Sequence, residues 1–177
     1  MVEWARVNVP HVSRPSILEI GSGNGTLIFA LIKAGYAPTS LTGIDYSSDA
    51  VKLAKAISTK RGIEGITFAK NDFLKDELHT FNAWDLILDK GTYDAIALGP
   101  KDENGYSPAI RYPARLAKLL KPGAYFLITC TFLIKADMFP CNCTSLACNF
   151  TEEELVSGFA TVETGLIYQS VKYLIDM

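Results

Sequence analysis

The chain has 177 residues, which suits one domain with a buried core. It is 49% hydrophobic and 20% charged, and its formal net charge of −2 excludes a general attraction to nucleic acid or to an anionic membrane. No apolar run approaches the ~20 residues of a membrane span, and the N-terminus lacks the basic-then-apolar pattern of a signal peptide. We therefore expect one domain over 1–177, located in the cytoplasm or the nucleus, without nucleic-acid or membrane partners.

The cysteines give no indication of a metal site. Reduced thiols are expected in the cytoplasm, so Cys130, Cys141, Cys143 and Cys148 are expected to be free. Their spacing, C-x-C followed by x4-C, lacks the paired C-x2-C pattern of zinc sites. We expect no bound metal.

Strands and helices are predicted to alternate along the chain. The strands are expected at 16–20, 40–45, 65–70, 84–89 and 124–130, and the helices at 25–35, from Ser47 or Ser48 to Lys60, at 108–120 and from a cap at Thr151, with a turn at 121–123. The strands are apolar runs without strict alternation, which is typical of a parallel sheet covered on both faces. The expected fold class is α/β, a doubly wound, Rossmann-like and mostly parallel sheet.

Three glycines stand where the first strand passes into a helix, in ILEIGSGNGTLIFALIKAG (17–35). Gly21, Gly23 and Gly25 would let the backbone turn tightly and approach a ligand at the carboxyl end of the strand. Glu19 precedes them and would repel a pyrophosphate, but it would suit a ligand that carries an ammonium group. This favours S-adenosylmethionine over a nicotinamide dinucleotide, which would need G-x-G-x-x-G.

Acidic residues also end the next three strands. Asp45 is expected to accept the ribose hydroxyls, and Asp72 to accept an adenine amine while Phe73 packs on the ring. Asp89, at the end of the fourth strand, is expected to face the cleft because burial within a strand would be costly. Each residue has a plainer reading as a turn, a helix cap or a loop acid; their shared place at one sheet edge favours a cofactor site.

The chain resembles class I S-adenosylmethionine-dependent methyltransferases from about Ile17 to Cys130. Four motifs together carry this resemblance: ExGxGxG, GIDYS, NDFL and D-x-G. LDKGTYDAI (88–96) and CNFTEEEL (148–155) resemble, more narrowly, the lysine methyltransferases of eukaryotic translation elongation factor 1-alpha. The resemblance implies methylation of a lysine on that protein, with S-adenosyl-L-methionine as cofactor. The cofactor-binding residues that it implies are Glu19, Gly21, Gly23, Gly25, Asp45, Tyr46, Asp72 and Asp89.

The loop after the fourth strand is the expected catalytic region. We expect Asp89 to orient the methionine end of the cofactor and Tyr93 to help form the entrance for the lysine. Thr92 and Asp94 are alternatively residues that stabilise the start of a helix. Neither His11 nor His79 falls near the predicted site, so catalysis by a serine–histidine or cysteine–histidine pair is not expected.

The two ends of the chain differ from the family pattern. Sixteen residues precede Ile17, and 131–147 separates the fifth strand from CNFTEEEL. We expect altered N- and C-terminal parts, with 131–147 poorly ordered or packed as a surface excursion that cofactor binding does not need. A small-molecule methyltransferase and an inactive cofactor-binding remnant are the alternative functions.

Overall fold

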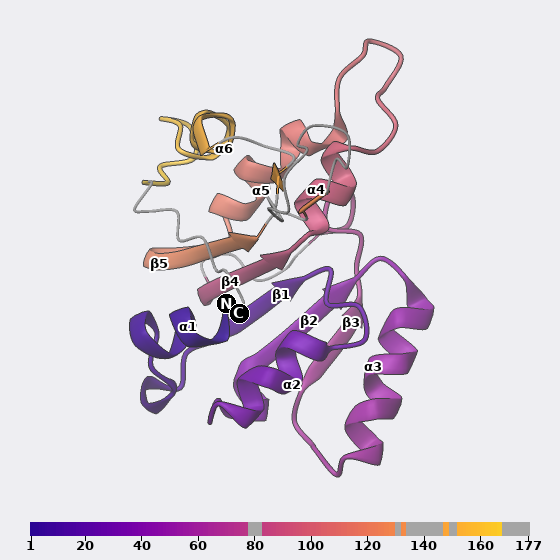
Figure 1. Cartoon of the computed structure of the whole chain (residues 1–177), viewed down its shortest axis with the longest axis vertical. Helices are drawn as coiled ribbons and strands as arrows, with labels where there is room; N and C mark the ends of the chain where they lie inside the picture. The colour runs from indigo at the N-terminus through magenta and orange to yellow at the C-terminus, as the bar shows by residue number, and fades with distance from the viewer. Residues whose placement is uncertain (78–82, 130–131, 134–146, 149–151, 168–177) are drawn as a thin grey trace, which may run out of the picture.

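The core of the molecule is a five-stranded parallel sheet (Figure 1). The computed structural model describes residues 1–77, 83–129, 132–133, 147–148 and 152–167. The strands are β1 (Ile17–Ile20), β2 (Leu41–Asp45), β3 (Thr67–Lys70), β4 (Trp84–Lys90) and β5 (Leu120–Thr129). Their order in the sheet is β3-β2-β1-β4-β5, and all four neighbouring pairs are parallel.

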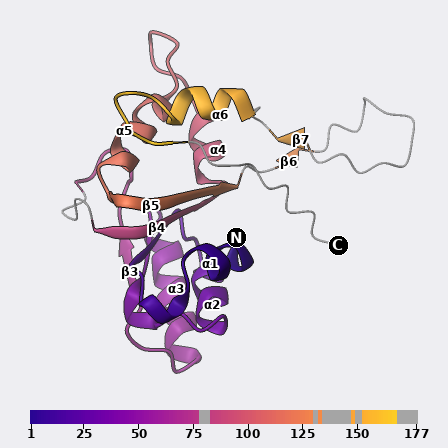
Figure 2. The ribbon, with the colours of Figure 1, turned by 90° about the vertical axis from the view of Figure 1, so that its left-hand side faces the viewer.

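Helices cover both faces of this sheet. Seen edge-on, α1 (Val2–Asn8), α2 (Thr26–Lys33) and α3 (Ser48–Lys60) lie on one side, and α4 (Thr92–Ala97), α5 (Tyr112–Ala117) and α6 (Glu152–Phe159) on the other (Figure 2). Short 3₁₀ segments occur at His11–Ser13, Pro38–Ser40 and Pro108–Arg111. The expected doubly wound α/β class is confirmed.

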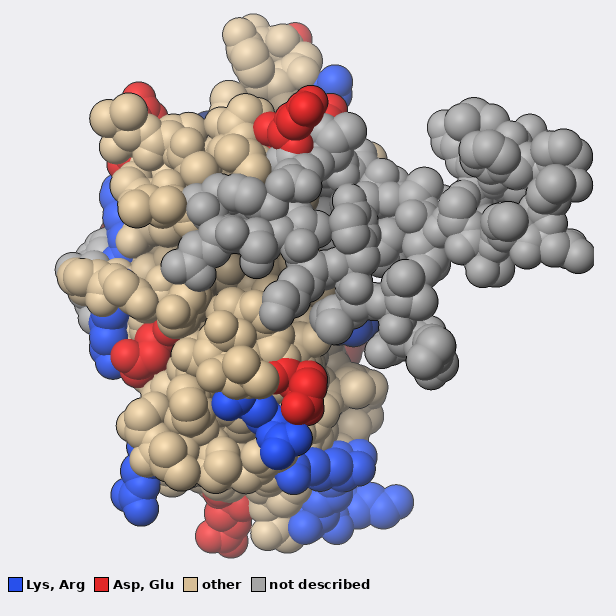
Figure 3. Space-filling model, turned by 60° about the vertical axis from the view of Figure 1, so that its left-hand side comes forward, with Lys and Arg blue, Asp and Glu red and all other residues tan. Residues whose placement is uncertain are grey.

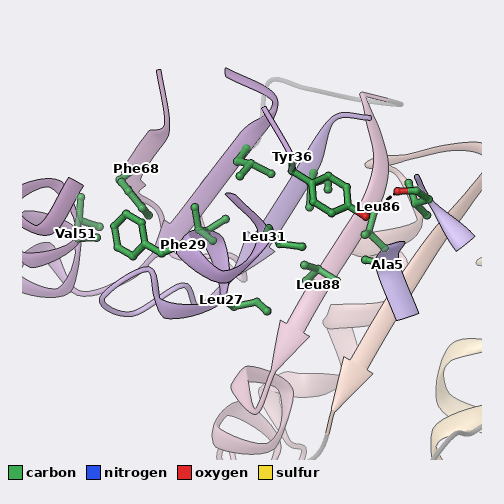
Figure 4. Close-up of a cluster of buried hydrophobic side chains, with 14 residues drawn as sticks. Ala5, Leu27, Phe29, Leu31, Tyr36, Val51, Phe68, Leu86 and Leu88 are labelled. Atoms are coloured by element: carbon green, nitrogen blue, oxygen red, sulfur yellow. Dashed lines mark hydrogen bonds between the residues drawn. The ribbon is translucent and has the colours of Figure 1, made fainter. Parts of the chain in front are cut away.

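The alternation of side chains along β1 and β4 divides the core into two clusters. Ile17, Leu86 and Leu88 face the layer of α1 to α3, where Phe29 and Leu31 belong to the same cluster (Figure 4). The intervening residues of the strands face the layer of α4 to α6, where the cluster is richer in aromatic rings. Because both faces are covered, every residue of β1 is buried, which explains why three of its four residues are apolar.

The predicted helix over 108–120 is wrong in its extent. A 3₁₀ segment occupies 108–111, α5 follows as far as Ala117, and β5 already begins at Leu120. The predicted turn at 121–123 instead lies inside β5, where the pairing with β4 is irregular and Gly123 has φ +77°. Pro122 has no N–H to donate to the hydrogen bonds between β5 and β4, and the irregular pairing is a bulge that accommodates it.

Several expectations fall partly outside the described residues. Of 131–147, the structure describes β6 (Phe132–Leu133), which pairs in antiparallel with β7 (Ala147–Cys148); the remainder, the cap at Thr151 and three of the four cysteines lie outside. Among the described helices, none is long and apolar enough to cross a membrane. One domain over 1–177 remains a prediction.

Candidate functional site

The predicted site residues gather at the carboxyl ends of the strands, around the centre of the sheet. β1 is followed along the chain by β2 on one side of it, whereas β4 lies on its other side and leads to β5. Connections therefore diverge between β1 and β4. In open α/β sheets this divergence opens a crevice at the strand ends, where ligands bind.

The three glycines of the loop after β1 have different surroundings, although all have positive φ. A Cβ at Gly21 would lie 1.9 Å from Thr92 Oγ1, and one at Gly25 would lie 2.8 Å from the ring of Phe68. Packing thus explains these two glycines. At Gly23, with φ +53°, a Cβ would meet no atom within 4 Å, so this glycine borders open space.

Asp45 shapes this glycine loop. Its Oδ2 accepts a hydrogen bond from the Gly23 N–H at 2.8 Å, and its Oδ1 accepts one from the Ser47 N–H at 2.8 Å. The carboxylate is 8% exposed. It therefore joins the loop after β1 to the cap of α3, and its remaining lone pairs are available to a further donor.

Glu19 is a buried carboxyl in the middle of the sheet. It pairs in register with Gly43 of β2 and Leu88 of β4 and is 3% exposed. Burial raises its pKa to about 8, against smaller opposing effects of the Ile28 N–H and the charge of Lys90. Its Oε2 has no hydrogen-bond partner in the described part of the chain. Burial in this position thus favours the protonated carboxyl, and a nearby cation is the kind of group that favours its ionised form.

Two further buried oxygens at this edge were missed by the sequence analysis. Ser22 Oγ and Asn71 Oδ1 are buried and have no partner among the described residues. Ser22 follows Gly21, and its N–H donates to Ile44 O at 2.9 Å; the Asn71 N–H donates to Asp45 O at 2.9 Å. The sequence signal for these two residues is their place within the motifs: Ser22 is the serine of GSG, and Asn71 is the asparagine of NDFL. Ser22 Oγ lies beside Gly43 of β2, where an added Cβ would be 2.7 Å from it. Both oxygens have hydrogen-bonding capacity that the described residues do not use.

Tyr46, which the family resemblance implies as cofactor-binding, and the two residues expected at the adenine lie in three different surroundings. Tyr46 is 76% exposed. Asp72 accepts from the Leu74 N–H at 3.1 Å and pairs with Lys75 at 3.3 Å. Phe73 is buried, with its ring 4.5 Å from that of Tyr112. Ring stacking by Phe73 on a ligand thus remains a prediction, alongside an evident packing role.

The expectation that Asp89 faces the cleft is wrong. Asp89 is fully buried, and its carboxylate accepts hydrogen bonds from the Thr92 N–H at 2.8 Å, the Tyr93 N–H at 3.0 Å and the Tyr112 hydroxyl. Burial raises its pKa to about 6, although these three donors lower it. The donors explain how the strand end tolerates a buried acid: Asp89 holds the first turn of α4.

Tyr93 and Tyr112 belong to an aromatic cluster beneath this loop. The Tyr93 ring lies 5.3 Å from that of Tyr112 and 5.0 Å from that of Phe159 in α6. Tyr112 is fully buried, and the sequence analysis missed it. The alternative reading of Thr92 is supported, because its Oγ1 donates to Ile20 O at 2.9 Å and ties α4 to the end of β1. A lysine entrance at Tyr93 remains a prediction.

A methyltransferase-domain family model matches residues 11–164, which include all of these residues. The chain belongs to this family. Its fold agrees: the PH0226 protein from Pyrococcus horikoshii OT3 matches with a TM-score of 0.53 at 18% identity, over 72% of this chain and 54% of that one. An S-adenosylmethionine-dependent methyltransferase from Mesorhizobium loti matches with a TM-score of 0.52 at 22% identity, over 72% and 52%. Both likenesses concern the class I methyltransferase fold.

More similar family members are named for lysine methylation. EEF1A lysine methyltransferase 2 of Mus musculus is 34% identical over 145 residues, which are 82% of this chain and 50% of that protein. Protein-lysine N-methyltransferase efm4 of Schizosaccharomyces pombe is 35% identical over 159 residues, 87% and 59% respectively. The chain thus spans between about half and three fifths of the length of these relatives.

Proposed function

We propose that this chain, as a single domain over 1–177, forms the methyl-transferring part of an S-adenosyl-L-methionine-dependent protein-lysine N-methyltransferase. The proposed substrate is translation elongation factor 1-alpha, and the proposed location is the cytoplasm. The observation that carries the proposal is the 34–35% identity, over more than four fifths of the chain, to relatives named for this activity. The predicted site residues fall within that family's domain.

The crevice fits the proposed cofactor in chemical terms. Glu19, with its unpartnered buried Oε2, suits an ammonium group, and Asp45 has lone pairs for ribose hydroxyls. The open space beside Gly23 admits a ligand close to the backbone. The unpartnered Ser22 Oγ and Asn71 Oδ1 add hydrogen-bonding groups that a polar ligand would satisfy.

S-adenosyl-L-methionine supplies a methyl group already activated on a sulfonium, so the protein has mainly to align the accepting amine and to exclude water. The accepting lysine must also lose its ammonium proton. Asp89 is poorly placed to take that proton, because its carboxylate already accepts three hydrogen bonds and is fully buried. We infer that Asp89 acts as a positioning residue, which fixes the backbone of Tyr93 at the proposed lysine entrance.

Incubation of the chain with tritiated S-adenosyl-L-methionine and purified elongation factor 1-alpha tests the proposal. We expect label on a single lysine, located by mass spectrometry of peptides. Asp45→Ala serves as the control, because it should lower labelling through weaker cofactor binding. Cofactor binding by calorimetry without transfer to protein would favour the inactive remnant, and transfer only to small molecules of a protein-free extract would favour the small-molecule enzyme.

A further inference from the structure

A basic pocket lies between the loop after β3 and α5. It has a volume of about 690 Å³, and its lining includes the cationic side chains of Lys75, Arg111, Arg115 and Lys118. None of the residues assigned to the cofactor crevice lines it. The pocket is therefore lined by other residues than the proposed cofactor site, which it adjoins through Asp72 and Phe73.

Two of these cations have no partner in the described part of the chain. Lys75 pairs with Asp72 at 3.3 Å, and Arg115 donates to the backbone oxygen of Asp76. Arg111 and Lys118 are exposed, and neither forms a hydrogen bond or an ion pair with another described residue. Their positive charges are thus available to an external group on a chain whose net charge is −2.

Arg115 is held at the wall of the pocket. Its guanidinium lies 5.8 Å from the centre of the Phe73 ring, and its Nε is buried without a hydrogen-bond acceptor among the described residues. The buried Nε is out of reach of an external group, so only the exposed part of this half-buried side chain can take part in binding. Arg115 therefore adds a positive charge at the wall between Arg111 and Lys118, whose side chains have no partner among the described residues.

Apolar side chains complete the lining. Leu74 and Ile110 belong to it, and Ile110 is 69% exposed. Arg111 ends the 3₁₀ segment before α5, Arg115 lies within α5 and Lys118 follows its last residue, so the three charges are distributed along this short helix and its two ends. A ligand that complements both the cationic and the apolar side chains of the lining has carboxylates next to an apolar group.

We propose that this pocket docks an acidic segment of a partner protein, in which aspartate or glutamate flanks an apolar residue. Charge complementarity carries the proposal: the carboxylates meet Arg111, Arg115 and Lys118, while the apolar side chain covers Ile110 and Leu74. The pocket shares no lining residue with the proposed cofactor site but adjoins it, because Lys75 pairs with Asp72 and Arg115 lies over the ring of Phe73.

Nucleic acid is the less suitable occupant. Phosphate backbones are bound along tracks of several cations, with strong dependence on salt. Figure 3 shows one face of the molecule, on which groups of basic side chains are separated by uncharged and acidic surface. A lining that combines four cations with the apolar side chains of Leu74 and Ile110 suits a peptide with acidic and apolar side chains better.

Fluorescence anisotropy with labelled peptides tests the pocket. The probe is Gly-Glu-Leu-Asp-Glu-Gly, and Gly-Gln-Leu-Asn-Gln-Gly is its uncharged counterpart. We expect the wild-type chain to bind the acidic peptide at least about tenfold more tightly than the uncharged one, and Arg111→Gln/Lys118→Gln to lose about tenfold in affinity for the acidic peptide. A thermal melt establishes that each variant is folded.

Lys33→Gln/Lys55→Gln is the matched control, because both lysines are exposed and lie on α2 and α3, on the opposite side of the sheet. It should bind the acidic peptide as the wild type does. Equal losses in the two double variants would overturn the proposal, because they would show a general charge effect. A single-stranded RNA oligonucleotide that competes for the pocket more strongly than the acidic peptide would also overturn it.

Discussion

Asp45 and Asp89 both end a central strand, but the two halves of the site use them differently. On the β2 side, Asp45 remains 8% exposed and accepts two backbone N–H groups, in a region where buried oxygens of Glu19, Ser22 and Asn71 have no partner among the described residues. On the β4 side, Asp89 is fully buried and accepts three donors. The β2 side of the site thus retains hydrogen-bond acceptors that a ligand could use. On the β4 side, the carboxylate of Asp89 already accepts hydrogen bonds that hold the loop.

The largest effect is expected from Asp89→Ala. The substitution leaves the Thr92 and Tyr93 N–H groups and the Tyr112 hydroxyl without their acceptor. We expect a loss of about 3–5 kcal/mol of unfolding free energy, or roughly 10 °C in Tm, measured by differential scanning calorimetry. A variant with unchanged Tm and reduced cofactor affinity would instead place Asp89 with Asp45 as a ligand-binding acid.

Gly23→Ala should abolish cofactor binding, with a loss of more than about hundredfold, because it adds a methyl group in the open space beside the loop. Gly62→Ala is a matched control: Gly62 also has positive φ, with no atom within 4 Å of the added Cβ, but it lies at the end of α3. Both variants should show the same modest decrease in Tm. Equal cofactor affinity in the two, measured by calorimetric titration, would show that the glycine merely makes a turn.

Asp45→Ala should weaken S-adenosyl-L-methionine binding by about tenfold to hundredfold, since a hydrogen bond to a charged group contributes about 1.5–3 kcal/mol. The helical circular dichroism spectrum should persist. Asp49→Ala, which removes an exposed acid of α3 that pairs only with Lys52 among the described residues, is the control and should bind normally. Unchanged affinity in Asp45→Ala would contradict the proposed ribose contact.

Tyr112→Phe should cost about 1.5–2 kcal/mol, because one of three donors to Asp89 is lost. The pKa of Asp89, already raised to about 6, should rise further, since the hydroxyl lowers it. A raised carboxyl pKa contributes stability that is present below the unfolded value and is lost as pH rises through the folded one. In the variant this loss should extend above pH 6 in melts recorded from pH 4 to 8. Superimposable pH profiles for the two proteins would refute the coupling.

The smallest effect concerns pH and Glu19. If its ionised form binds the ammonium group, cofactor affinity should rise about fivefold between pH 7 and pH 8, because the pKa is about 8 in the free protein. Titrations in buffers of different ionisation enthalpy should also show proton release on binding. Glu19→Gln should bind more weakly and without this pH dependence. Its Tm at pH 8 should exceed that of the wild type, since no acid then has to ionise in the core.

Much of this arrangement could be predicted from the sequence, because it follows from local patterns. The apolar run ILEI, the glycines after it and the acid Asp45 each indicate a strand end and a ligand loop without tertiary information. The burial of Asp89 could not be predicted in this way. It depends on Tyr112, 23 residues further along the chain, whose hydroxyl reaches the carboxylate only after α5 has packed on the sheet.

The same limit explains the errors around β5. Proline followed by glycine in Lys121-Pro122-Gly123 is typical of a turn, and the sequence pattern predicts this turn between the helix over 108–120 and the strand over 124–130. In the structure Lys121 instead bonds to Asp85 at 2.8 Å, and Asp85 accepts from both the N–H and the hydroxyl of Ser16. These bonds join the starts of β1, β4 and β5, so that β5 begins before the bulge, at Leu120. They connect residues far apart in the sequence and cannot be predicted from local sequence patterns.

The bonds of Asp45 to Gly23 and of Ile44 O to the Ser22 N–H also have a thermodynamic consequence for binding. They fix the glycine loop while the chain folds, so the conformational entropy of ordering that loop is lost before any ligand arrives. Binding then has less disorder to remove, and affinity gains from this preorganisation without an additional contact. A loop of three positive-φ glycines, among the most mobile sequences that a chain can have, becomes in this way a rigid recognition surface.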